Sequence, residues 1–162
     1  MTKIIYHGSN VGVTEPNLNM SVRALDFGKG FYTTDSYEQA KEWAIKKSQK
    51  FGNIPMISRF EFDLTDLRIK SFEQADKTWL DFVFMCRKDI NTCLDKEFDV
   101  IIGAVANDTL FRIIGYYEDN TYDWEETIKR LKVNPVYNQL CICSDTGISK
   151  LQFLDSEVIK YE

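Results

Sequence analysis

The chain has 162 residues, in which 20 Lys and Arg oppose 25 Asp and Glu for a net charge of −5. Hydrophobic residues make up 44% and aromatic residues 14%, which excludes a disordered or low-complexity protein and allows a core without disulfides or metal. A pI near 5.0 argues against a broad nucleic-acid-binding surface, although a local basic groove stays open. No repeat or linker divides the sequence, so we expect one domain over residues 1–162.

The sequence gives no sign of export or of a membrane span. Its N-terminus lacks a secretory signal, and no apolar run is long enough to cross a bilayer. The cysteines fit neither a zinc-binding spacing nor a secreted disulfide framework. We therefore expect a cytoplasmic protein with reduced, buried cysteines, and a metal or redox role is the alternative. The four cysteines are Cys86, Cys93, Cys141 and Cys143.

The first third of the chain is predicted to form two strands and a helix. A strand over residues 3–7 ends at a glycine, and the two glycines within residues 28–30 predict a tight turn into a second, short strand. Asp35 and Glu38 then have the spacing of a capping box at the start of a helix.

The rest of the chain mixes strands and helices. The predicted elements are a strand over 55–63, a helix from Asp76, a strand over 99–106, helices from Asp108 and Asp123, and strands over 138–144 and 156–161 around a short helix at 146–150. Helices cluster in the middle and hairpin turns are scarce. The pattern therefore favours an α+β fold over a regular βαβ winding.

His7 is the only histidine and the first candidate for a functional role. It stands at the predicted end of the first strand, beside Gly8, where a ligand could approach the backbone, and close to the Ser9 hydroxyl. A lone histidine near a strand end is also typical of a structural role.

Further candidates stand where predicted strands begin or end. The glycines before Phe31 and Tyr32 match neither a Rossmann nor a Walker loop, and we expect them to let these rings present an aromatic face at a cleft; ordinary core packing is the alternative. Asn107 follows a predicted strand and is a candidate ligand contact. Gln139, at the entrance to a buried strand, must find amide partners or point into a cleft. No cluster has metal-ligand spacing, so no metal site is predicted.

Several segments of the chain stand together in a distinctive order. They are Tyr6-His7-Gly8-Ser9, Asp26-Phe27-Gly28-Lys29-Gly30-Phe31-Tyr32-Thr33-Thr34 with the helix carrying Glu38, Gln39, Ala40 and Trp43, Trp79-Leu80-Asp81-Phe82-Val83, Gly103-Ala104-Val105-Ala106-Asn107-Asp108, and Asn138-Gln139-Leu140. Taken together, over nearly the whole chain, they resemble bacterial domain-of-unknown-function family 3990, which is grouped with the ADP-ribosyltransferase superfamily.

The resemblance implies both a fold and a ligand. The fold would be a split β-sandwich, in which two small, mainly antiparallel sheets flank an NAD cleft and helices pack outside. His7 would hydrogen-bond the adenosine ribose or the nearby NAD backbone, the Gly8 backbone would hold the nicotinamide amide, and Tyr32 would stack on nicotinamide. The expected NAD-binding residues are thus His7, Gly8 and Tyr32 from the resemblance, together with Ser9, Phe31 and Asn107 from their places in the sequence.

Gln139 stands where the resemblance implies a glutamate that assists the acceptor, and with His7 and Tyr32 it completes the expected catalytic set. An amide cannot stabilise, through charge, the cation that develops on ribose when the nicotinamide–ribose bond breaks. It also cannot act as a base, and losing a base typically costs about 10² to 10⁴ in rate.

Three ways around this loss stay open. Another acid such as Asp26, Asp108 or Asp145 supplies the charge, the acceptor is itself a good nucleophile, or the protein binds a nucleotide without transferring it. We accordingly expect an NAD-dependent mono-ADP-ribosyltransferase acting on a macromolecular acceptor, as a toxin or phage-defence effector. The alternative is a weak or inactive NAD- or ADP-ribose-binding module that acts through a partner protein, such as an antitoxin. Under the first hypothesis, Gln139→Glu should raise turnover.

Overall fold

Strands and helices alternate irregularly along the chain in a computed structural model, which describes residues 1–20, 25–88, 97–106, 110–131 and 134–160. The strands are β1 (Thr2–Ser9), β2 (Phe31–Thr34), β3 (Met56–Asp63), β4 (Ile69–Ser71), β5 (Val100–Val105), β6 (Asn134–Ile142) and β7 (Leu151–Val158). The helices are α1 (Tyr37–Phe51), α2 (Lys77–Lys88), α3 (Leu110–Glu118), α4 (Trp124–Leu131) and α5 (Asp145–Ser149), with a 3-10 turn at Leu18–Met20. The sequence missed β4 and placed the last strand too late.

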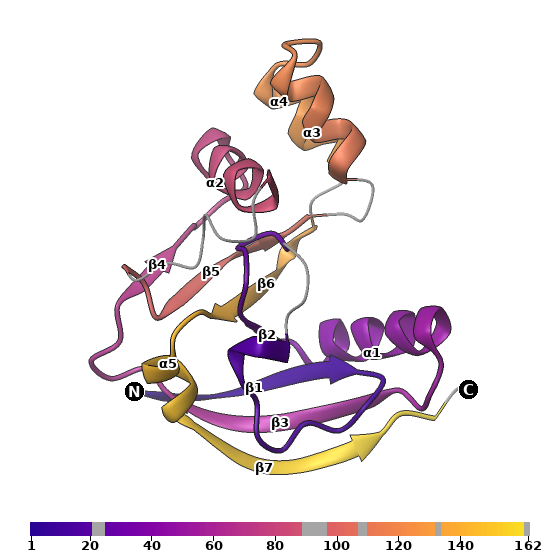
Figure 1. The fold of residues 1–162 in the computed structure, drawn as a ribbon, viewed down its shortest axis with the longest axis vertical. Helices are drawn as coiled ribbons and strands as arrows, with labels where there is room; N and C mark the ends of the chain where they lie inside the picture. The colour runs from indigo at the N-terminus through magenta and orange to yellow at the C-terminus, as the bar shows by residue number, and fades with distance from the viewer. Residues whose placement is uncertain (21–24, 89–96, 107–109, 132–133, 161–162) are drawn as a thin grey trace.

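The strands form one seven-stranded sheet in the order β4-β5-β6-β2-β1-β3-β7 (Figure 1). Neighbouring strands are antiparallel, except β4 and β5, which are parallel. The predicted α+β class is therefore confirmed. Figure 1 places β4, β5 and β6 together in one half of the molecule and β1, β3 and β7 together in the other.

The continuity of the sheet corrects the expectation of two separate sheets. β2 pairs along its whole length with β6. Within these fully described strands, β2 pairs with β1 at one position, Tyr6 opposite Thr34. That pairing joins the two halves, and the strands separate beyond it, toward Gly8 and Tyr32. Strand order and register are properties of the folded chain, and the alternation of apolar residues did not reveal them.

Helices α1 and α2 each cover one half of the sheet. A Cβ atom at Gly8 would lie 1.9 Å from the carbonyl oxygen of Ala40, so α1 can approach β1 only because residue 8 is glycine. In the other half, the buried Trp79 of α2 packs in one core cluster with Ile101 and Cys141 of β5 and β6. A second cluster joins the two halves of the sheet; its buried members are Ile5, Val13, Phe31, Phe60, Phe62, Val100, Leu140 and Ile142.

Three helix starts test the predicted caps. Helix α1 begins after Ser36, whose side chain accepts a hydrogen bond from the Gln39 backbone N–H at 3.2 Å, so the predicted capping role of Asp35 was wrong. Asp76 and Asp123 do cap α2 and α4, because each carboxylate accepts a backbone N–H three residues further on, at 3.0 and 2.8 Å.

Cys141 and Cys143 are free and buried, as predicted. Cys86 is disulfide-bonded, so the expected reduced thiol there was wrong; residue spacing does not report a covalent bond. Cys93 lies outside the described residues. Among the residues described, no helix is long and apolar enough to cross a bilayer. The same residues contain no group of three or more His, Cys, Asp or Glu that could hold a metal ion.

Candidate functional site

His7 lies where β1 and β2 separate, and its Nδ1 atom is 2.7 Å from the carbonyl oxygen of Tyr32. A carbonyl only accepts hydrogen bonds, so Nδ1 carries the hydrogen, and in the neutral ring Nε2 is then an acceptor. Burial, with a smaller contribution from the charge of Lys47, lowers the pKa of His7 to about 4, against the opposing effect of the bond to Tyr32. His7 is therefore a neutral acceptor of fixed tautomer at physiological pH.

The neighbours of His7 support its ring. Phe31 is 3% exposed, and its ring centroid lies 4.4 Å from that of His7. Phe31 is thus core beneath the imidazole, and its direct exposure to a ligand is small. Ser9 is also buried, and its hydroxyl donates to the side-chain oxygen of Asn10 at 3.4 Å. Gly8 has a packing reason of its own, the close approach of α1.

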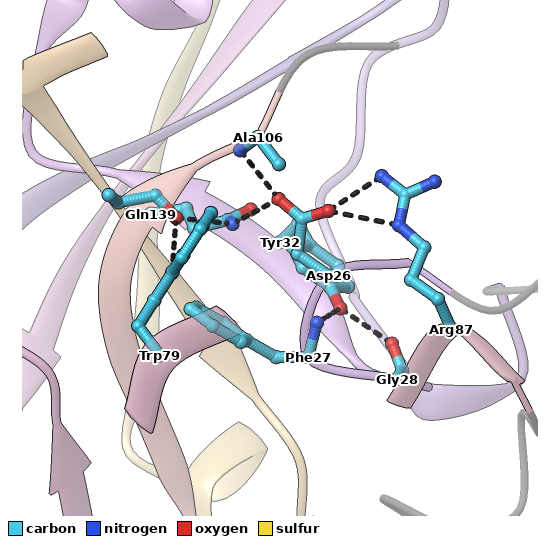
Figure 2. Close-up of polar contacts among 9 residues, drawn as sticks. Asp26, Phe27, Gly28, Tyr32, Trp79, Arg87, Ala106 and Gln139 are labelled. Carbon is cyan, nitrogen blue, oxygen red and sulfur yellow. Dashed lines mark hydrogen bonds and ion pairs between the residues drawn. The ribbon is translucent and has the colours of Figure 1, made fainter. Parts of the chain in front are cut away.

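The Tyr32 hydroxyl hydrogen-bonds the turn that precedes β2 (Figure 2). Its hydroxyl donates to the Gly28 carbonyl oxygen at 2.6 Å and accepts from the Phe27 backbone N–H at 2.9 Å. Gly28 has φ of 80°, a left-handed conformation that favours glycine. Burial first, and then the nearby Cys141 and Asp26, raise the pKa of Tyr32 well above its ordinary value, so the hydroxyl keeps its proton.

Asp26 carries a buried carboxylate that receives hydrogen bonds on both oxygens. Arg87, at the end of α2, donates to Oδ1 from Nη2 at 2.6 Å and from Nε at 3.0 Å. The Ala106 backbone N–H donates to Oδ2 at 2.9 Å, and Gln139 Nε2 donates to the same oxygen at 2.8 Å. The side chains of Asp26 and Arg87 are 4% and 12% exposed, so the pair is almost fully removed from water.

The side-chain amide of Gln139 is hydrogen-bonded within the protein, which is one of the two predicted outcomes. Its Nε2 donates to Asp26 and, at 3.1 Å, to the Ala104 carbonyl oxygen. The residue is 3% exposed, so little of its side chain is available to a ligand. Figure 2 shows Gln139, Asp26 and Arg87 in a line across the turn held by Tyr32.

The structure brings the three expected catalytic residues close together, but not onto one face of the sheet. Tyr32 is opposite Cys141, two residues from Gln139, so the side chains of Tyr32 and Gln139 share a face. Phe31 points to the other face, where the ring of His7 packs against it. His7 reaches Tyr32 through its main-chain oxygen. Asn107 and Asp108 lie outside the described residues, and Asp145 is exposed at the start of α5.

Sequence reasoning named Asp26 only as one possible source of charge and missed Arg87 and the Ala106 N–H. Asp26 belongs to a motif quoted for the resemblance, but the arginine that pairs with it is 61 residues away along the chain. A buried carboxylate requires a partner, which is the one signal that could have prompted a search for an arginine.

A cavity of about 420 Å³ lies elsewhere, between α1 and strands β3 and β7. Arg59 and Asp155, which form an ion pair, line it, together with Tyr37 and Glu157, which share a hydrogen bond. None of His7, Tyr32 and Gln139 contributes to its lining.

The comparison with known proteins gives a family. The family model described as "Protein of unknown function (DUF3990)" matches residues 3–153. No curated protein matches the chain. Because the family match spans most of the 162 residues, the chain belongs to the DUF3990 family.

Proposed function

We propose that the domain binds NAD where β1 and β2 separate, and that it is an NAD-dependent mono-ADP-ribosyltransferase acting on a macromolecular acceptor. The observation that supports this most directly is the state of His7, a neutral imidazole whose Nδ1 is engaged by Tyr32. Its Nε2 is suited to accept a hydrogen bond from a ribose hydroxyl. The likeness of the site segments to the ADP-ribosyltransferase superfamily supplies the identity of the nucleotide.

Both sides of β2 would contribute to NAD binding. His7 and Tyr32 present their rings on opposite faces of the strand, so a ligand touching both must cross the Tyr32 main chain near Gly8. Tyr32 is partly exposed, and its ring is oriented by two hydrogen bonds of its hydroxyl. A ring held in this way offers nicotinamide a surface for stacking with little loss of side-chain entropy.

In the transfer reaction, the bond between ribose C1′ and the nicotinamide nitrogen breaks, and its electron pair leaves with neutral nicotinamide. The acceptor forms the new bond to C1′, and its proton passes to water. Gln139 offers neither charge nor a base for these steps. The charge of Asp26 faces Arg87 and is largely neutralised by it. Transfer would therefore depend on the placement of NAD and on a good nucleophile in the acceptor.

A second candidate function is favoured by the contacts of Gln139. Its Nε2 donates to both Asp26 and the Ala104 carbonyl oxygen, and the side chain is buried. This arrangement suits a module that binds NAD or ADP-ribose and acts through a partner protein, without transferring the nucleotide.

The first experiment is calorimetric titration with NAD of the wild type and of His7→Asn. Asparagine can keep the donor to Tyr32 and removes the acceptor at Nε2. We expect His7→Asn to remain folded and to bind NAD about tenfold more weakly, the effect of losing one hydrogen bond. His7→Gln is the matched control, because glutamine can place an acceptor near the position of Nε2. No binding by the wild type at millimolar NAD would sink the proposal.

The second experiment separates the two functions. Radiolabelled NAD is incubated with the protein and a cell lysate, and both nicotinamide release and labelling of macromolecules are measured. Release with labelling supports the transferase. NAD binding with neither supports the binding module.

A further inference from the structure

Two carbonyl-type acceptors converge on one amide at Gln139, which explains why this residue is a glutamine. Its Nε2 lies 2.8 Å from Asp26 Oδ2 and 3.1 Å from the Ala104 carbonyl oxygen. An amide nitrogen has two hydrogens to give to two acceptors, and a carboxylate has none. A glutamate here would face a buried carboxylate and a carbonyl oxygen with no donor for either.

We propose that Asp26 is a positioning residue of the NAD site and that Gln139 acts through Asp26, not on the substrate. This inference rests on the proposed function, because it concerns how the NAD-contacting residues are held. It reverses the expectation that Gln139→Glu would restore a missing carboxylate.

The contacts of Asp26 lead directly to Tyr32. Asp26 is tied to the end of α2 by Arg87, to the residue after β5 by the Ala106 N–H, and to β6 by Gln139. The next residue, Phe27, donates its backbone N–H to the Tyr32 hydroxyl. Asp26 therefore sets the position of the turn that orients the Tyr32 ring (Figure 2).

The arrangement of donors also accounts for an aspartate at this position. Four hydrogen bonds from three residues arrive at the two oxygens of Asp26. Asparagine would turn an NH₂ group toward at least one of these donors. Arg87 and the Ala106 N–H approach opposite sides of the group, and each needs an acceptor there. A carboxylate provides an acceptor on both sides.

The test is a double-mutant cycle with NAD affinity and thermal stability as its two measurements. The variants are Asp26→Asn, Gln139→Glu and their combination, with Gln139→Met as a milder change that removes the amide without adding a charge. Asp99→Asn is the matched control, because Asp99 is equally buried and also bonds an arginine, but belongs to a different cluster. All titrations use free NAD at a temperature where every protein is folded.

We expect Gln139→Met to weaken NAD binding by about tenfold and Gln139→Glu to weaken it further. Adding Asp26→Asn to Gln139→Glu should make the loss smaller, because the second carboxylate is gone. Asp99→Asn should lower the melting temperature and leave the NAD affinity unchanged. Neither Gln139 variant should release nicotinamide faster than the wild type.

Several results would overturn the inference. The first is that the losses in NAD affinity of Asp26→Asn and Gln139→Glu simply add in the double variant. The second is that Gln139→Met folds and binds NAD with wild-type affinity. The others are that Gln139→Glu releases nicotinamide faster, or that Asp99→Asn loses as much NAD affinity as the Gln139 variants. If Gln139→Glu does not fold, the comparison of Gln139→Met with Asp99→Asn decides. A wild type that binds no NAD overturns the proposed function, and this inference with it, even if residues 26 and 139 are coupled in thermal stability.

Discussion

Two buried aspartates, Asp26 and Asp99, are held by nearly the same chemistry in different parts of the molecule. Each is paired with an arginine that donates from Nε and Nη2, and each also accepts a backbone N–H and a side-chain donor. The Asp99 cluster comprises Arg68 and Ser144, which is the N-cap of α5. It joins the start of β5 to the segment before β4 and to α5.

The two clusters differ in their arginines and in what lies beside them. The Arg68 side chain is 53% exposed, whereas that of Arg87 is 12% exposed. Asp99 lies near the sheet edge formed by β4, while Asp26 adjoins the turn that is hydrogen-bonded to Tyr32. The same hydrogen-bonded carboxylate is therefore a fold contact in one place and a candidate positioning contact in the other. A buried ion pair by itself does not indicate function.

The largest difference should follow from removing the carboxylates. Asp26→Ala removes the buried carboxylate that accepts hydrogen bonds from Arg87, Gln139 and the Ala106 N–H, and we expect a loss of about 3–5 kcal/mol in the free energy of unfolding. Asp99→Ala should cost about 1–3 kcal/mol, since Arg68 can return to water. Urea unfolding of both variants measures the two losses. Equal losses would remove the distinction between the clusters.

Replacing each arginine should show the same difference between the two clusters, with smaller losses of stability. Arg87→Met leaves the Asp26 carboxylate buried with two of its four hydrogen bonds, and about 3 kcal/mol of stability should be lost. Arg68→Met also leaves a buried carboxylate, Asp99, with two of its four hydrogen bonds, but the lost partner is mostly in water, so the loss should be smaller, about 1–2 kcal/mol. Chemical unfolding monitored by tryptophan fluorescence measures both. A larger effect at Arg68 would contradict our account of burial.

The third comparison removes one side-chain donor from each cluster, Gln139 beside Asp26 and Ser144 beside Asp99. Gln139→Met removes a bond to a charged group and one to a carbonyl, for an expected loss of about 1.5–3 kcal/mol. Ser144→Ala removes the cap of α5 and one bond to Asp99, and should cost about 0.5–2 kcal/mol. Differential scanning calorimetry compares the two melting temperatures. The ranges overlap, so the decisive sign is a change in NAD affinity that accompanies only Gln139→Met.

The elements near both clusters were largely predictable from the sequence, because their signals are local. Asp76 and Asp123 cap helices where expected, and the apolar run predicted over 99–106 contains strand β5, Val100–Val105. The three residues of β4 carry too little alternation to be recognised. The cap of α1 shifted by one residue because Ser36 is as good an N-cap as Asp35.

The candidate site was only partly predictable, because its contacts are long-range. His7 and Tyr32 were named from local motifs and are in contact. The pairing of Asp26 with Arg87 and Gln139 joins residues 61 and 113 apart in the chain, and no local pattern encodes such a partner. Gln139 was interpreted by its place in a family pattern as a lost carboxylate, whereas its surroundings account for an amide.

Acid should distinguish the site from the Asp99 cluster by the pH at which each loses stability. The pKa of His7 falls to about 4 in the folded protein, from about 6.5 in an unfolded chain. The unfolded state therefore binds the proton first, and stability should fall as the pH drops from about 6.5 toward 4, by at most about 1.4 kcal/mol per pH unit.

The pKa of Asp99 is also lowered, mainly by its hydrogen bonds to Arg68, but from an unfolded value near 3.9. Its contribution is complete above that value and should be lost only at lower pH, where the unfolded carboxylate takes up a proton first. Urea unfolding at a series of pH values measures both windows. We expect His7→Asn to flatten the profile between pH 6.5 and 4, and Asp99→Asn to flatten it only below about pH 4. A profile unchanged by His7→Asn would mean that folding does not lower the pKa of His7, and the imidazole would then begin to take up a proton near pH 6.5, where Nε2 loses the lone pair that could accept from a ribose hydroxyl.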